Sequence, residues 1–196
     1  VARSLAAQGA SLLLDARRAE ELLLLSQQLP GHHSCFSADL TANHDILALI
    51  DFVKATGGID ILINNVGGAI WMKPFEEFSE EEIIKEVNRS LFPTLWCCRA
   101  VLPAMRASRA GHVVNISSLG GVQSSAGFGL YCSTKFAVEG ITEALHAELA
   151  PLGIHATVVE PGYFRTEFLD SASLAVSPQV LDDYAQSAGA VREAAR

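Results

Sequence analysis

Tyr131 and Lys135 are spaced so that a helix would place them on one face, one turn apart. A tyrosine phenol has an unperturbed pKa of about 10 and is a poor base at neutral pH. A nearby ammonium group favours the phenolate and lowers that pKa. The pair therefore predicts a tyrosine that exchanges a proton with an alcohol or ketone oxygen. By itself the spacing is also compatible with a surface pair on a helix.

Ser118 strengthens the catalytic interpretation. It follows a β-branched run at residues 112–116 that reads as a strand, so it should lie at the carboxyl end of that strand. The stretch between Ser118 and Tyr131 is long enough to turn back and bring the hydroxyl beside the phenol. A serine in that place can hydrogen-bond a substrate oxygen and stabilise developing charge. The neighbouring Ser117 is interpreted as a turn residue that closes the strand.

Short apolar runs alternate with longer helical patterns along the chain. We expect strands at residues 11–14, 34–38, 59–63, 112–116 and 154–159. We expect helices at residues 2–8, 19–29, 41–55, 79–108 and 131–150, with Thr41 and Ser79 as N-caps and Pro93 and Pro103 as kinks or breaks. This alternation predicts an α/β fold built from βαβ units around a parallel sheet. Polar and glycine residues cluster where the strands end, which is where such sheets bind ligands.

Composition excludes several other classes. The chain has 196 residues, a size that fits one domain over 1–196. Its net charge of −8 argues against nucleic acid or an anionic membrane surface as a partner. No apolar run approaches the length of a membrane-spanning helix. The four cysteines and six histidines show no metal-ligand spacing, so we expect no metal and a reducing, cytoplasmic location.

Five segments occur in the order and at the spacings of a known family. They are Asn64-Asn65-Val66-Gly67, Asn88, Asn115-Ile116-Ser117-Ser118, the Tyr131/Lys135 pair, and Pro161-Gly162-Tyr163-Phe164-Arg165-Thr166. Through them the chain resembles the short-chain dehydrogenase/reductase family. That resemblance implies a Rossmann-type, doubly wound parallel sheet in three α/β/α layers. It also implies hydride transfer between a secondary alcohol or ketone and NAD(H) or NADP(H).

The same resemblance implies roles for individual residues. Tyr131 would be the acid/base, Lys135 would lower its pKa, Ser118 would orient the substrate carbonyl, and Asn88 would support a proton relay through water. Cofactor contacts are implied for Asp39, Leu40, Asn65, Val66, Gly67, Pro161, Gly162 and Thr166, besides Tyr131 and Lys135. Outside the family context, several of these segments could be plain turns.

Arg17 bears on which cofactor is used. The segment Asp15-Ala16-Arg17-Arg18 falls where the adenosine ribose should lie in this family. Arginine pairs with a 2′-phosphate, whereas a carboxylate accepts from a free 2′-hydroxyl. We therefore favour NADP, and Asp15 keeps NAD possible. Arg17 and Arg18 could instead be the solvated start of a helix.

The chain departs from the family pattern at both ends. The glycine-rich phosphate loop, the first strand and the last strand are not found, so we expect part of a longer enzyme, with residues 167–196 a partial substrate lid. The alternative is a non-catalytic cofactor-binding module. Apolar residues predict an apolar carbonyl or alcohol substrate: Trp71, residues 127–130, Phe164, Phe168 and Leu169. By analogy with the family we expect a homodimer or homotetramer.

Overall fold

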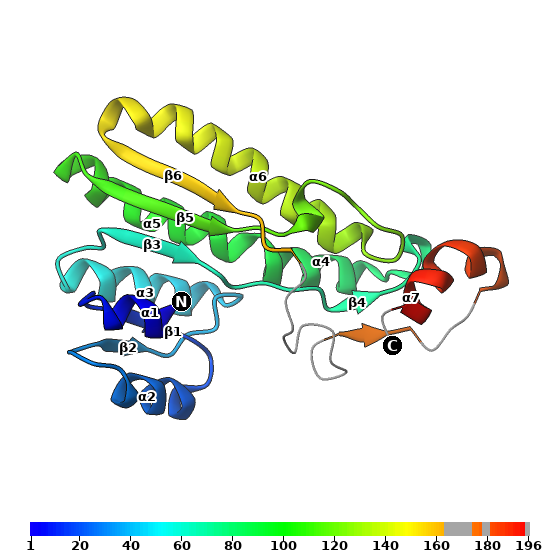
Figure 1. Cartoon of the computed structure of the whole chain (residues 1–196), viewed down its shortest axis with the longest axis horizontal. Coiled ribbons are helices and arrows are strands. Elements are labelled where there is room, and N and C mark those ends of the chain that lie inside the picture. The colour runs from blue at the N-terminus through cyan, green and yellow to red at the C-terminus, as the bar shows by residue number, and fades with distance from the viewer. Residues whose placement is uncertain (163–173, 178–180, 195–196) are drawn as a thin grey trace. The chain divides into compact units, whose positions relative to one another are not determined.

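The computed structural model describes residues 1–162, 174–177 and 181–194 (Figure 1). The chain divides into two compact units, Val1–Thr56 and Gly57–Arg196. The single domain expected over residues 1–196, with a partial lid at 167–196, stays a prediction.

The first unit is a βαβ unit with a helix at either end. Its elements are α1 (Ala2–Ala7), β1 (Leu13–Asp15), α2 (Ala19–Gln28), β2 (Ser34–Phe36) and α3 (Asn43–Ala55). β1 and β2 pair in parallel, with Leu14 opposite Cys35. The strands are shorter than the apolar runs predicted, but each lies at the expected place.

The start of α3 differs from the prediction. Ala42 is its N-cap residue, and its side chain makes no capping hydrogen bond. Thr41 does not cap the helix because the Asp39 carboxylate engages it. Asp39 Oδ1 accepts both the Thr41 hydroxyl, at 2.7 Å, and the Thr41 backbone N–H, at 3.0 Å. The local Asx turn therefore competes with the cap and delays the helix.

The second unit contains two parallel sheets. Its strands are β3 (Ile61–Asn64), β4 (Trp71–Met72), β5 (Gly111–Ile116), β6 (Ile154–Val159) and β7 (Ala175–Val176). β5 lies between β3 and β6 and pairs in parallel with both. β4 and β7 form a separate two-residue parallel pair, which the sequence did not predict. β6 has the bounds that the sequence predicted.

The helices of this unit are α4 (Glu80–Ser90), α5 (Phe92–Ser108), α6 (Gly129–Leu149) and α7 (Ala190–Ala194). The helix predicted over 79–108 is interrupted at Leu91, because Pro93 belongs to the first turn of a new helix, where proline is tolerated. Pro103, predicted to kink or break the helix, lies inside α5 without ending it. Ser79 and Glu82 form the predicted capping box at the start of α4.

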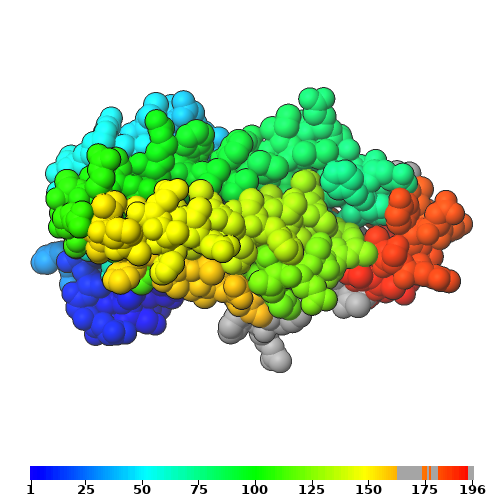
Figure 2. Space-filling model, turned by 90° about the horizontal axis from the view of Figure 1, so that it is seen from above, coloured from blue at the N-terminus to red at the C-terminus, as the bar shows by residue number. Residues whose placement is uncertain are grey.

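α5 and α6 cover the same face of the three-stranded sheet. Their core cluster holds Cys98, Val101 and Met105 from α5, Leu145 and Leu149 from α6, and Val113, Ile154 and Ala156 from the strands. α6 runs alongside β6 in Figure 1, and Figure 2 shows its side chains bordered by those of α5. The carboxyl end of β5 is thereby brought beside the first turns of α6.

Every strand pair among the described residues is parallel, and helices connect the paired strands. The predicted Rossmann-type α/β class is confirmed. In the described part of the chain, no helix has both the length and the apolar character needed to cross a membrane. The four cysteines form no disulfide. No group of three or more His, Cys, Asp or Glu side chains is placed to hold a metal within the described ranges.

Candidate active site

A buried polar network fixes the carboxyl ends of β3 and β5 to α6. Asn64 Nδ2 donates to Asn115 Oδ1 at 2.8 Å, and Asn115 Nδ2 donates to Thr142 Oγ1 at 2.8 Å. The Thr142 hydroxyl in turn donates to the carbonyl of Val138. Since amides and hydroxyls are costly to bury without partners, this chain of bonds locks two strands and a helix in one arrangement. The loops that follow β3 and β5 start from that fixed base.

Ser118, Tyr131 and Lys135 lie together at the carboxyl end of β5. Tyr131 lies in the first turn of α6, is buried, and is hydrogen-bonded to the side chain of Ser118. Lys135 follows one turn later, with Nζ 5.9 Å from the centre of the Tyr131 ring. Its ammonium donates to the carbonyl oxygen of Ile116, the last residue of β5, at 2.9 Å. The structure therefore brings the three residues together as the sequence predicted, although their roles are a separate question.

Burial acts on both titratable groups of this cluster. It raises the pKa of the Tyr131 phenol above its ordinary value of about 10, and the hydrogen bond with Ser118 lowers that pKa in part. Burial also lowers the pKa of Lys135 to about 8, against the carboxylates of Glu139 and Glu86, which raise it. The phenol is therefore protonated at neutral pH, whereas the pKa of Lys135 lies close to neutral pH. A protonated phenol beside an ammonium group can donate a proton and then hold the resulting negative charge.

The turn that carries Ser118 is held in place from both sides. The Ser118 side chain accepts the backbone N–H of Gly120 at 3.1 Å. The Leu119 N–H donates to the carbonyl of Pro161 at 3.0 Å, which places the end of β6 against this turn. Ser118 is half-buried. Pro161 and Gly162 thus lie by the serine, whereas the predicted site residue Thr166 and the apolar Phe164, Phe168 and Leu169 lie outside the described residues.

Gly67 places bare backbone beside Lys135. Its φ of +134° lies in a region that L side chains rarely adopt. A Cβ at this position would lie 3.4 Å from Ser90 Cα and 3.7 Å from Lys135 Nζ. The preceding Asn65 and Val66 are exposed. An exposed loop whose backbone conformation favours glycine, next to the lysine, fits a cradle for an extended cofactor.

Asn88 is in α4 and half-buried. Its side chain makes no hydrogen bond to another residue in the described part of the chain. Its neighbours on α4 are engaged instead: Glu86 and Ser90 are buried and bonded to the loop that follows β3. The sequence analysis missed both of these residues. Their spacing of four residues puts them on one helix face, but only their contacts with the loop distinguish them from the other polar residues of α4.

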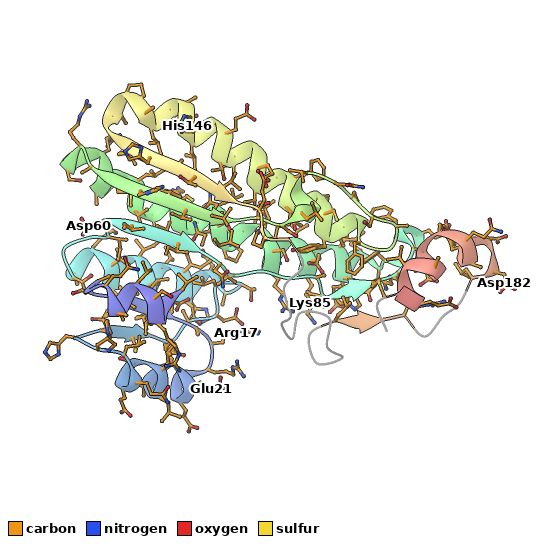
Figure 3. All side chains as sticks on the ribbon, in the orientation of Figure 1. Arg17, Glu21, Asp60, Lys85, His146 and Asp182 are labelled. Carbon is orange, nitrogen blue, oxygen red and sulfur yellow. The ribbon has the colours of Figure 1, made fainter. Side chains whose placement is uncertain are left out.

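In the unit Val1–Thr56, three polar residues gather after β1 and β2. Asp15 accepts the backbone N–H of Ala38, and burial raises its pKa to about 6. The pKa of Asp39 is lowered by its two hydrogen bonds from Thr41, and the charge of Arg17 contributes to the lowering. Arg17 is exposed in the loop between β1 and α2 (Figure 3), and Leu40 is buried. This group can contact a polar ligand with Arg17 and Asp39.

Comparison with known proteins identifies the family to which the chain belongs. A model of the short chain dehydrogenase family matches residues 1–176. Two bacterial proteins named 1,6-dihydroxycyclohexa-2,4-diene-1-carboxylate dehydrogenase are similar to the chain. The one from Acinetobacter baylyi is 55% identical over 108 residues, which are 54% of this chain and 40% of that protein. The one from Pseudomonas putida is 41% identical over 169 residues, which are 83% of this chain and 60% of that protein. The chain thus spans about half the length of these relatives.

Solved structures agree with the family model. A short-chain dehydrogenase from Streptomyces avermitilis matches with a TM-score of 0.87 at 36% identity, over 97% of this chain and 70% of that one. A short-chain dehydrogenase from Sphingobium yanoikuyae, solved in complex with NADPH, matches with a TM-score of 0.82 at 29% identity. That match covers 100% of this chain and 79% of that one.

Proposed function

The chain belongs to the short-chain dehydrogenase family, and on that premise we propose that it interconverts a secondary alcohol and a ketone with NADP(H). One observation carries the proposal: Tyr131, buried at the start of α6, is hydrogen-bonded to Ser118 and stands one helical turn from Lys135.

In the direction of alcohol oxidation, Tyr131 removes the hydroxyl proton of the substrate while Ser118 hydrogen-bonds the same oxygen. Tyr131 must be a phenolate in order to accept that proton. Lys135, when protonated, stabilises this phenolate. In the reverse direction the phenol returns the proton to the carbonyl oxygen. The nicotinamide cofactor, when bound, accepts or supplies the hydride.

Two groups of residues are proposed to hold the cofactor. In the second unit these are Asn65, Val66, Gly67, Tyr131, Lys135, Pro161, Gly162 and Thr166, while Asn88 is proposed to support a proton relay through water. In the first unit these are Arg17, Asp39 and Leu40. The bare backbone at Gly67 and the exposed guanidinium of Arg17 support this assignment. The NADPH bound to the Sphingobium protein supports NADP as the cofactor.

The substrate is proposed to be a small carbonyl or alcohol compound bound against apolar side chains. Trp71 of the predicted apolar set is half-buried and edge-on to Phe78 with ring centres 6.3 Å apart, which supports an apolar surface at β4. The two bacterial relatives are named for a ring diol that carries a carboxylate. A vicinal ring diol carboxylate therefore belongs in the first substrate panel beside apolar ketones and alcohols.

A homodimer or homotetramer is also proposed. The aromatic side chains of Phe92 and Trp96 on α5 are 37% exposed, and Phe136 on α6 is 47% exposed. The rings of Phe92 and Trp96 are tilted at 56° to each other, with their centres 6.2 Å apart. Large aromatics exposed on two neighbouring helices support a self-association surface.

The decisive experiment compares the protein with its Tyr131→Phe variant in NADPH- and NADH-linked assays over the substrate panel. Loss of the phenol should reduce kcat by about 10²- to 10⁴-fold, while cofactor binding measured by fluorescence is retained. Ser133→Ala is the matched control, because this exposed α6 serine bonds only the carbonyl of Leu130 among the described residues. A Tyr131→Phe variant with full activity would overturn the proposal. Cofactor binding with no turnover on any substrate would favour the non-catalytic module.

A further inference from the structure

Glu86 is an acidic residue in an environment that acids rarely occupy. It lies in the last turns of α4 and is 1% exposed. Its Oε2 accepts the backbone N–H of Ile70 at 2.9 Å, and its Oε1 accepts the hydroxyl of Ser90 at 2.9 Å. Burying a carboxyl group is costly unless it is paired and hydrogen-bonded, so its presence here calls for a role.

The first part of that role is mechanical. The Ser90 Oγ that bonds Glu86 also lies 3.2 Å from the carbonyl oxygen of Gly68 and 3.4 Å from its N–H. With the bond from Ile70 to Glu86, α4 therefore holds the loop of residues 64–70 at two points. Gly67, the bare backbone position beside Lys135, lies just before these points. The position of that backbone thus depends on the Glu86–Ser90 pair.

The second part is electrostatic. The Glu86 charge raises the pKa of both Tyr131 and Lys135, and the Lys135 ammonium acts back to lower the pKa of Glu86. Burial, the larger effect on Glu86, raises its pKa. The other charged or titratable groups that act on this cluster are Glu139 on Lys135, Cys132 on Tyr131, and Arg89 on Glu86. Two carboxylates from different helices, Glu86 on α4 and Glu139 on α6, therefore act on one buried ammonium.

We propose that Glu86 is a positioning residue for the Tyr131–Lys135 pair: it fastens the 64–70 loop to α4 and, with Glu139, keeps Lys135 in its charged form. This inference rests on the proposed function for its significance, because a phenol that exchanges a proton needs a cation beside it. Burial alone would bring Lys135 close to losing that charge near neutral pH. The position of the loop and the charge of the Lys135 ammonium therefore depend on the same side chain.

The test removes the charge and keeps the shape. In Glu86→Gln, an amide oxygen can still accept the Ile70 N–H, but the negative charge is gone. The titration of Lys135 is followed without substrate or cofactor, from its rate of acetylation by acetic anhydride against pH, read by peptide mass spectrometry with exposed Lys54 as the internal reference. We expect the Lys135 midpoint to fall from about 8 by about 0.5 pH units or more. The alkaline limb of kcat/KM should move in the same direction.

Two control variants separate the effect of the Glu86 charge from the effect of the hydrogen bonds that hold the 64–70 loop. Glu81→Gln removes an exposed carboxylate from the same helix and should leave the Lys135 midpoint in place. Ser90→Ala removes the bonds to Gly68 and also a hydroxyl that lowers the pKa of Glu86, so it should weaken NADPH binding and move the midpoint less than Glu86→Gln does.

An unchanged Lys135 midpoint in folded Glu86→Gln, verified by circular dichroism, would overturn the inference. If that variant does not fold, Lys135→Met is tested instead. Loss of the ammonium should raise the pKa of Glu86, which is measured by carbon NMR. An unchanged pKa of Glu86 would contradict the coupling between the two residues. A shifted midpoint in a protein that turns over no substrate would contradict the proposed function alone. Turnover with an unshifted midpoint would contradict this inference alone.

Discussion

Asn64 and Asn115 lie opposite each other in the β3–β5 register, and the side-chain amide of Asn64 donates to the side-chain oxygen of Asn115 at 2.8 Å. Asn115 is fully buried, and its side-chain amide donates a hydrogen bond to Thr142 of α6. The polar network thus ties the two strands whose ends carry the candidate site to the helix that carries Tyr131.

Asn115→Ala should destabilise the fold. It removes the oxygen that accepts from the Asn64 amide and the amide that donates to Thr142 Oγ1, and each hydrogen bond lost in this buried site costs about 1–3 kcal/mol. We expect the free energy of unfolding in urea to fall by roughly 2–4 kcal/mol. Asn65→Ala, one residue past Asn64 and exposed, is the control and should change it little. Equal stability of the two variants would show that the network contributes nothing.

Arg17→Ala should relax the choice of cofactor. If the exposed guanidinium binds the 2′-phosphate, its loss removes charge-assisted hydrogen bonds and lowers the preference for NADPH over NADH by roughly 10- to 100-fold. Fluorescence titration with both cofactors measures that ratio. Arg18→Ala is the matched control, because Arg18 pairs with Glu21 at 2.8 Å on the surface. A ratio that drops as far in Arg18→Ala would refute a specific role for Arg17.

Gly67→Ala should impair cofactor binding more than folding. A methyl group would lie between the loop, Ser90 and Lys135, and the positive φ adds strain of about 1–3 kcal/mol. We expect NADPH to bind roughly tenfold more weakly. Gly140→Ala, in α6 with no atom within 4 Å of the new methyl group, provides the comparison. Unaltered NADPH affinity in Gly67→Ala would place the cofactor away from this loop.

Asp15 should make stability depend on pH. Burial raises its pKa in the folded chain to about 6, above the ordinary 3.8, so folding favours the protonated form. Stability from this group is fully present below the ordinary pKa and is lost as pH rises through about 6. Asp15→Asn should therefore stabilise the protein near neutral pH, by on the order of 1 kcal/mol after allowance for solvent screening, and not at pH 4.

Urea unfolding of Asp15→Asn at both pH values measures this difference. The exposed Asp51, paired with Lys54 at 3.1 Å, supplies the control variant Asp51→Asn. A gain that is the same at both pH values would point to packing rather than to titration of Asp15.

Features set by neighbours in the chain could be predicted from the sequence. The capping box needs only Ser79 and Glu82, and it was found where expected. β6 was predicted with its observed bounds because its apolar run is flanked by a glycine before and a proline after. The approach of Ser118 to Tyr131 followed from strand and helix placement alone. Each of these depends on short-range rules that the residues carry with them.

Features set by competing contacts or by distant partners could not be predicted in this way. Thr41 was predicted to cap α3, but the Asp39 carboxylate competes for it. The two-residue strands β4 and β7 have no periodicity to detect, and their pairing depends on chain segments about 100 residues apart. Glu86 belongs to an acidic helix that reads as solvated, and only the packing of the 64–70 loop against α4 shows that it is buried.

The central place of β5 has a consequence for synthesis on the ribosome. Asn64 of β3 is made 51 residues before its partner Asn115 in β5, and β5 must in turn wait for β6. At a translation rate of about 5–20 residues per second, the nascent chain holds an apolar, unpaired strand for several seconds. Helices such as α5 form in about a microsecond and can cover that strand before its neighbour emerges. Protection of β3 in the newborn chain thus falls to the helix that precedes β5.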